Sequence, residues 1–258
     1  MKELSIKQIE HNWKKLRDTI ENTFDGDRLI NLNKMYDYFE DRMCMAPASG
    51  KEHYHYAHVG GYVEHVLHII DYALQIKGTW EKNGATINFT DEELIFAAMH
   101  HDLGKVGDMD NDHYLPNESD WHVKNQGKLY VNNPDIQFMT PPDRGLWILN
   151  QFGIKMTVNE VLGIKLADGM YDDGNIQYLK SYSPEKKLKS NLPLIVHQAD
   201  MATTRIEYEM SKQVERQEEQ KVQKSVEKIK EAASSEQVSE QLSQKSKDLF
   251  DELFGDDS

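Results

Sequence analysis

Apolar residues recur at steps of three and four along most of the first 210 residues, and this spacing is what most constrains the fold. It places successive apolar side chains on one face of an α-helix, whereas a half-buried strand alternates apolar and polar residues. Two such helical faces near the start consist of Ile6, Ile9, Trp13, Leu16 and Ile20, and of Leu29, Leu32, Met35, Tyr36 and Phe39. Convincing alternating stretches are few, so the sequence predicts an all-α protein.

The chain divides into three parts by pattern and composition. Residues 1–45 are expected to form two helices that pack on the following body, since both carry an apolar face. Residues 46–210 are expected to form that body, as a helical bundle. Residues 211–258 are mostly Glu, Gln, Lys and Ser, with only a thin apolar stripe. Because so little apolar surface can be buried there, we expect either a marginal solvated helix or a disordered tail.

Inside the body, two helix starts are marked by capping boxes. Thr90 with Glu93, and Thr157 with Glu160, have the hydroxyl-to-carboxylate spacing of this motif. Between these two starts, residues 107–142 are rich in Asp, Asn and Pro and are predicted to be a loop.

Charge and cysteine content exclude several classes of protein. The chain has 44 acidic and 30 basic residues, a net charge of −14, which argues against broad non-specific binding to nucleic acid. A single cysteine, Cys44, excludes an intramolecular disulfide framework and fits a reducing compartment. There is no apolar run of about 18 residues and no apolar core of a secretory signal. We therefore expect a cytoplasmic protein with no membrane partner.

Histidines are concentrated in one region, since nine of the eleven lie between His53 and His122. Imidazole together with carboxylate suits borderline divalent metals such as zinc, manganese, iron, cobalt or nickel. Such groups stand at or near the ends of apolar helices at His65, at the adjacent pair His101 and Asp102, and at Asp200. A rigid helical scaffold would hold ligands at these points in convergent positions.

Three segments carry these residues in the order His, His-Asp and Asp, with helices between them. They are HYAHVGGYVEHVLHIIDYA at 55–73, ELIFAAMHHDLGKVGD at 93–108 and LPLIVHQADMAT at 192–203. Over about residues 50–210 the chain resembles the HD superfamily of metal-dependent phosphohydrolases. The resemblance implies an HD-type helical domain with one divalent ion per chain, drawn from Mn, Fe, Co, Ni, Zn and Mg. It also implies the ligands, which are His65, His101, Asp102 and Asp200.

Further site residues follow from position and from the same resemblance. Lys105 stands about one helical turn after Asp102 and is expected to place its charge on a substrate phosphate. His55 matches a histidine of relatives with the Gly-Gly pattern, and could bind phosphate or protonate a leaving oxygen. Arg144, near a helix start, is a candidate phosphate contact. Asp168 stands where two-metal relatives often carry histidines, so it is a candidate ligand, base or substrate contact, and a second metal is not expected.

The function predicted on these grounds is hydrolysis of a phosphate ester of a nucleotide or nucleic-acid end by a metal-activated water. One alternative is a 3′→5′ exonuclease acting on single strands, which the acidic body makes less attractive. Another is a non-catalytic binding protein whose metal is structural. Trp121, Tyr130, Phe138 and Trp147 could stack on a base, although aromatic side chains are used more often in cores.

The chain ends in DLFDELFG at 248–255, where apolar pairs alternate with acids. The apolar residues are Leu249, Phe250, Leu253 and Phe254. The segment resembles C-terminal peptides by which DNA polymerases and accessory factors of large tailed phages bind their sliding clamp. That resemblance implies a sliding-clamp partner and a phage-encoded protein working in host cytoplasm. An acidic terminus with an exposed apolar patch is the alternative interpretation.

Overall fold

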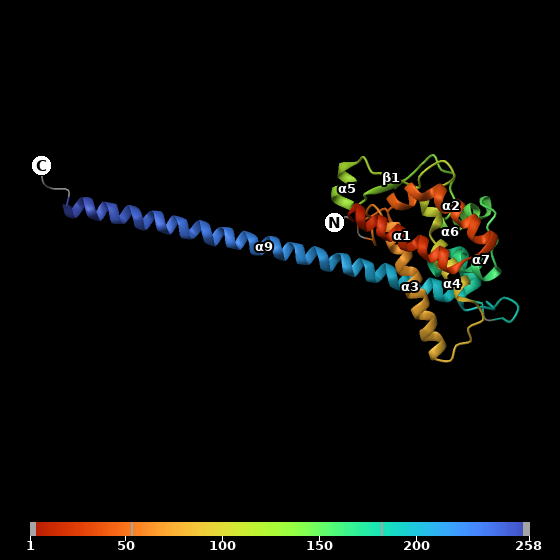
Figure 1. The fold of residues 1–258 in the computed structure, drawn as a ribbon. Helices are drawn as coiled ribbons and strands as arrows, with labels where there is room; N and C mark the ends of the chain where they lie inside the picture. The colour runs from red at the N-terminus through yellow and green to blue at the C-terminus, as the bar shows by residue number, and fades with distance from the viewer. Residues whose placement is uncertain (1–3, 53, 182, 255–258) are drawn as a thin grey trace. The chain divides into compact units, whose positions relative to one another are not determined.

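Helices make up almost all of the regular structure, as the apolar spacing predicts. The computed structural model describes residues 4–52, 54–181 and 183–254, except for the side chains of residues 215, 231–242 and 247–254. The helices are α1 (Ile6–Thr23), α2 (Gly26–Met45), α3 (Gly61–Lys82), α4 (Asp91–His100), α5 (Asp120–Gln126), α6 (Pro141–Gln151), α7 (Val158–Lys165), α8 (Ile176–Leu179) and α9 (Leu192–Phe254) (Figure 1). Short 3-10 turns are η1 (Leu103–Val106), η2 (Gly169–Tyr171) and η3 (Asp173–Asn175). The all-α prediction is confirmed.

The segment predicted to be a loop at 107–142 contains a small hairpin. Strands β1 (Tyr114–Pro116) and β2 (Tyr130–Asn132) pair antiparallel, and α5 lies between them in the chain. The amide of Tyr130 donates to the carbonyl of Gly50 over 3.0 Å, which ties the hairpin to the segment after α2. Strands of three residues give no alternating pattern long enough to be seen in the sequence, so this part of the prediction was wrong.

The chain forms two compact units, Met1–Ser211 and Lys212–Ser258. In the second unit every described side chain from residue 213 onward is exposed, and the backbone is helical as far as Phe254. The structure therefore agrees with a solvated helix, one of the two predicted states. Within the described residues no helix is both long and apolar enough to cross a bilayer.

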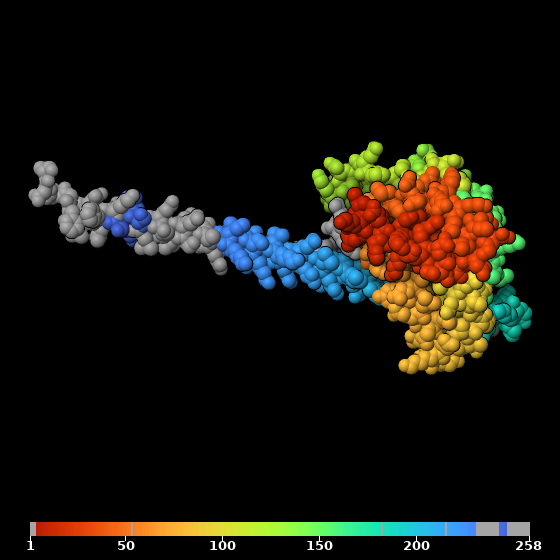
Figure 2. All heavy atoms as spheres, viewed as in Figure 1, coloured from red at the N-terminus to blue at the C-terminus, as the bar shows by residue number. Residues whose placement is uncertain are grey.

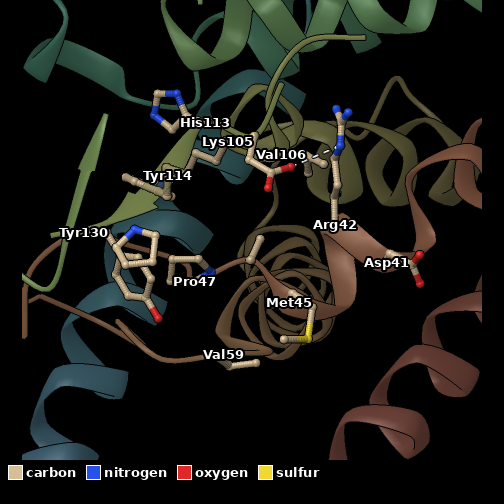
Figure 3. A pocket seen from close by; sticks show the side chains of 13 residues that line it. Asp41, Arg42, Met45, Pro47, Val59, Lys105, Val106, His113, Tyr114 and Tyr130 are labelled. Atoms are coloured by element: carbon tan, nitrogen blue, oxygen red, sulfur yellow. Dashed lines mark ion pairs between the residues drawn. The ribbon is translucent and has the colours of Figure 1, made fainter. Parts of the chain in front are cut away.

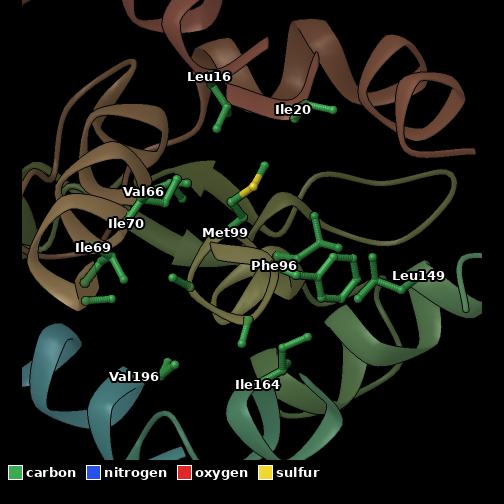
Figure 4. Packing of buried hydrophobic residues seen from close by; sticks show 14 of the residues in the cluster. Leu16, Ile20, Val66, Ile69, Ile70, Phe96, Met99, Leu149, Ile164 and Val196 are labelled. Atoms are coloured by element: carbon green, nitrogen blue, oxygen red, sulfur yellow. The ribbon is translucent and has the colours of Figure 1, made fainter. Parts of the chain in front are cut away.

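One hydrophobic core holds the first unit together. Helix α3 packs against α1, α2 and α4, while α4 also packs against α7. The N-terminal helices α1 and α2 cover one face of this unit (Figure 2). Side chains at the centre of the core include Leu16, Ile20, Val66, Ile69, Phe96, Met99, Leu149, Ile164 and Val196 (Figure 4).

The two predicted capping boxes are confirmed. The hydroxyls of Thr90 and Thr157 accept the backbone N–H groups of Glu93 and Glu160, and each glutamate side chain accepts the N–H of its threonine. These bonds satisfy N–H groups that have no partner within the helix, and so fix where α4 and α7 begin.

Gly163 allows α7 to lie unusually close to its neighbours. A Cβ atom at this position would lie 2.5 Å from Leu192 Cδ2 and 2.7 Å from Ala97 Cβ. These distances are shorter than van der Waals contact, so a larger residue would push α7 away from α4 and from the start of α9.

The substitution Gly163→Ala is expected to destabilise the protein by about 1–3 kcal/mol through overpacking. Gly78→Ala in α3 is the matched control, because a Cβ there meets no atom within 4 Å. The control should stabilise the helix by about 0.5–1 kcal/mol, since alanine loses less backbone entropy than glycine. Urea unfolding of both variants measures the difference, and equal effects would contradict the close packing.

Candidate metal centre

Three helices bring the four predicted ligands together. His65 comes from α3, His101 and Asp102 follow directly from the end of α4, and Asp200 comes from α9. The apolar faces of these helices pack into the core, and that packing carries the polar side chains inward with them. Both histidines are buried, with exposures of 0% and 1%. The carboxylate of Asp200, 18% exposed, lies on the more open side.

The imidazole and carboxylate groups face one another at short range. Nε2 of His65 lies 3.8 Å from Oδ2 of Asp102 and 3.7 Å from Oδ1 of Asp200. Nε2 of His101 lies 3.4 Å from the same Asp102 oxygen and 3.8 Å from the same Asp200 oxygen. Ligand atoms each about 2.1 Å from one tetrahedral ion have separations near these values.

The chemistry of the donors supports the same interpretation. Nε2 of His65 and Nε2 of His101 are both buried and have no hydrogen-bond partner among the described residues. A buried polar atom without a partner costs about 1–3 kcal/mol, so two of them facing two carboxylates need an explanation. A divalent ion explains both, and these residues fit one.

The other ring nitrogen of each histidine, Nδ1, already makes a hydrogen bond. Nδ1 of His101 donates to the carbonyl of Ala98 over 2.8 Å, and Nδ1 of His65 donates to Oε2 of Glu207 over 2.9 Å. With the proton of the neutral ring on Nδ1, the lone pair of Nε2 is left to face the centre. Such outer hydrogen bonds fix the orientation and tautomer of metal-binding histidines.

Glu207 also belongs to this centre, although the sequence patterns did not single it out. Its carboxylate is buried on α9, and its second oxygen, Oε1, accepts from Nδ1 of His68 over 2.9 Å. A signal was available in the sequence, because Glu207 follows Asp200 by seven residues. That interval is about two helical turns, so the two carboxylates lie on one face of α9.

The charges of the centre are strongly coupled. Burial lowers the pKa of His65, but Glu207 and Asp200 outweigh burial and raise that pKa to about 10. Burial raises the pKa of Asp102, but Lys105 and His101 hold it well below its ordinary value. Asp102 is therefore ionised at neutral pH, and the side chain of His65 holds a proton that a metal would have to displace.

Lys105 lies beside the centre, as the sequence predicts. Its Nζ donates to Oδ2 of Asp102 over 2.5 Å and to the carbonyl of Ala48 over 3.1 Å. The same side chain lines a pocket of about 380 Å³ (Figure 3). Lys105 thus fixes a ligand carboxylate and also presents positive charge where a substrate could enter.

His55 also lies at the centre. Its ring centroid is 4.5 Å from that of His65, and its Nε2 is buried without a partner among the described residues. Burial, together with His65 and Lys105, lowers the pKa of His55 to about 3. The neutral ring suits hydrogen bonding to a phosphate oxygen better than it suits donating a proton at neutral pH.

The remaining predicted residues differ in their positions. Asp168 is close enough for the charges of Asp102 and Asp200 to help burial raise its pKa. Arg144 is buried, and its guanidinium donates to the carbonyl of Gly104 over 2.9 Å and to His113 Nδ1 over 3.0 Å. It also donates to two further carbonyls, so its bonds hold loops together, and its phosphate contact stays a prediction. The side chains of the predicted clamp-binding residues, Leu249, Phe250, Leu253 and Phe254, lie outside the described residues.

Comparison with known proteins gives no match: no protein-family model, no curated protein and no solved structure is significantly similar to this chain. The geometry of the centre therefore carries the functional argument.

Replacing Glu207 with Ala is expected to lower metal affinity by about 10–100-fold, because the ring of His65 loses the bond that orients it. Glu209→Ala is the matched control, since Glu209 is an exposed glutamate on the same helix. Competition with a chelator measures affinity, and thermal unfolding checks that both variants are folded. If Glu207→Ala and Glu209→Ala bind metal equally tightly, Glu207 does not position His65.

Metal affinity is also expected to depend on pH. The metal-free form carries a proton on His65 up to a pKa of about 10, whereas the metal-bound form cannot. Burial lowers the pKa of His101, but Asp102 and Asp200 outweigh burial and raise that pKa as well. Since these protons bind only the metal-free form, affinity should rise by at least about tenfold per unit between roughly pH 6 and pH 8. Chelator competition across this range, in metal-free starting protein, makes the measurement. An affinity independent of pH would show that His65 is not a ligand.

Proposed function

We propose that the protein is a metal-dependent phosphohydrolase of the HD type, acting on a phosphate ester of a nucleotide or nucleic-acid end. The observation that supports this proposal is that three helices bring four side chains able to bind a metal to one point. Within that group, Nε2 of His65 and Nε2 of His101 are buried without partners and face Asp102 and Asp200. An ion held by these four groups would satisfy both nitrogens, which otherwise have no hydrogen bond within the described residues.

The residues that would hold the ion are His65, His101, Asp102 and Asp200. A divalent ion at such a site supplies Lewis acidity, which makes water a better nucleophile at neutral pH and withdraws electrons from a phosphoryl oxygen. Two carboxylates and two neutral imidazoles suit Mn, Fe, Co, Ni or Zn better than Mg, because Mg prefers oxygen ligands.

The chain's own residues supply binding and orientation. An ammonium has three N–H groups, and Lys105 uses two of them on Asp102 and Ala48. The third remains for a phosphate oxygen entering from the pocket that Lys105 lines. The neutral ring of His55, packed on His65, can hydrogen-bond a second oxygen. Fixed donors of this kind hold the phosphate in place and offset its negative charge.

The substitution Asp102→Asn is expected to lower phosphate release by about 10³-fold or more, because a ligand charge is lost while side-chain volume is kept. Asp71→Asn is the matched control, as Asp71 is an exposed aspartate of α3. The assay follows phosphate release from nucleotides and short oligonucleotides with each divalent metal added in turn.

Unchanged turnover by a folded, metal-depleted Asp102→Asn protein would exclude the mechanism. Tight metal binding without release from any substrate would instead favour the non-catalytic binding protein. Sliding-clamp binding through Leu249, Phe250, Leu253 and Phe254 remains a separate proposal, tested by pull-down with Phe250→Ala and Phe254→Ala.

A further inference from the structure

A pocket is connected to the candidate metal centre through Lys105, which lines the pocket and donates to Asp102. It has a volume of about 380 Å³ and lies where the end of α2 and the residues after it meet η1 and the β1–β2 hairpin (Figure 3). Its walls are largely apolar and aromatic, formed by Met45, Pro47, Val59, Pro116, Tyr114 and Tyr130. Small-molecule pockets have volumes of about 300–1,000 Å³ and mostly apolar linings with a few polar groups, and this pocket lies at the small end of that range.

One end of the pocket is polar and presents hydrogen-bond donors. Lys105 contributes the N–H that Asp102 and Ala48 leave available. His113 contributes a second donor. Because arginine can only donate, Nδ1 of His113 must accept from Arg144, and the proton of the neutral ring is therefore on Nε2. Burial, together with Arg144 and Lys105, lowers the pKa of His113 to about 4, which keeps that ring neutral.

The remaining charged residues of the pocket do not suit the binding of a nucleic-acid strand. Asp41 and Asp112 are acidic lining residues. Arg42 also lines the pocket, but it pairs with Oδ1 of Asp112 over 3.1 Å and donates to the carbonyl of Asp108 over 2.6 Å. Binding a strand requires a track of basic groups along its backbone, and these residues do not form one.

The aromatic wall of the pocket is held in place by the segment after α2. Tyr130 donates its amide to the carbonyl of Gly50, and a Cβ on Gly50 would lie 3.3 Å from the ring of Tyr114. Of the aromatic residues that could stack on a base, Tyr130 lines this pocket, whereas Trp121 is 59% exposed on α5 and does not.

We propose that this pocket binds the base of a nucleoside monophosphate, whose single phosphate lies at the Lys105 end next to the metal centre. The inference rests on the proposed phosphohydrolase function and narrows it from nucleotides and strand ends to mononucleotides. Tyr130 provides the stacking surface for the base. The apolar side chains of the walls offer no hydrogen-bond donor to a second phosphate group beyond the one at Lys105.

Isothermal titration calorimetry of the full chain, with Mn²⁺ present, tests the proposal. The probes are the 5′- and 3′-monophosphates of the four deoxyribonucleosides, the same nucleosides without phosphate, and an eight-nucleotide single strand. At least one monophosphate should bind at least tenfold more tightly than its nucleoside and no more weakly than the strand. Tyr130→Leu should weaken that binding by about tenfold, within the range measured for loss of base stacking, and Tyr130→Phe should preserve it.

Trp121→Ala is the matched control and should leave binding unchanged. Thermal unfolding shows whether each variant is folded, and the conservative Tyr130→Phe keeps the comparison interpretable if Tyr130→Leu is not. Three results would each overturn the proposal. The strand could bind more tightly than every monophosphate, no monophosphate could exceed its nucleoside tenfold, or folded Tyr130→Leu could bind as tightly as the unchanged protein.

Phosphate release measured on the same proteins separates this inference from the function on which it rests. If a monophosphate binds in a way that depends on Tyr130 but is not hydrolysed, the proposed phosphohydrolase function is wrong and the proposed nucleotide pocket stands. If strand ends are hydrolysed with metal and Tyr130→Leu does not change the rate, the phosphohydrolase function stands and the proposed nucleotide pocket is wrong.

Discussion

Two buried imidazole nitrogens that face two carboxylates are the constraint on which the rest of this structure depends. Burying charged groups is costly unless they are paired or bind a metal. Here, Nε2 of His65 and Nε2 of His101 have no hydrogen-bond partner among the described residues, and each lies 3.4–3.8 Å from carboxylate oxygens of Asp102 and Asp200. The helices α3, α4 and α9 thus meet at a point that a cation would stabilise, and their packing decides where it binds.

The segment between α2 and α3 connects the centre to the pocket. Within this segment, the carbonyl of Ala48 accepts a hydrogen bond from Lys105, and the ring of His55 packs on that of His65. The carbonyl of Gly50 accepts a hydrogen bond from the amide of Tyr130. Tyr56 in the same segment has a positive φ of 41°, an uncommon conformation for a residue with a side chain. Gly61 follows closely, and a Cβ there would lie 2.2 Å from the carbonyl oxygen of Tyr56. A tight turn therefore brings His55 back onto the start of α3.

Local pattern was enough to predict the helices, whereas the proposed ligand set came from the resemblance of three strings to the HD superfamily. Apolar spacing and capping boxes depend on residues within about one turn of each other, so they can be seen in the sequence. The four residues of that set lie in distinctive strings at or near helix ends, and the structure brings their side chains together. Glu207 was missed since its role depends on His65, which is 142 residues away. The bonds of Arg144 to Gly104, and of Tyr130 to Gly50, depend on tertiary packing in the same way.

We propose that this chain holds one divalent metal ion between α3, α4 and α9. The most direct test is the metal content of the intact protein, measured by inductively coupled plasma mass spectrometry alongside a His65→Ala, Asp200→Ala double variant. We expect about one transition metal per chain in the native protein and a large loss in the variant, with both proteins folded. Absence of metal from the native protein, even after reconstitution with Mn, Fe, Co, Ni and Zn, would contradict it.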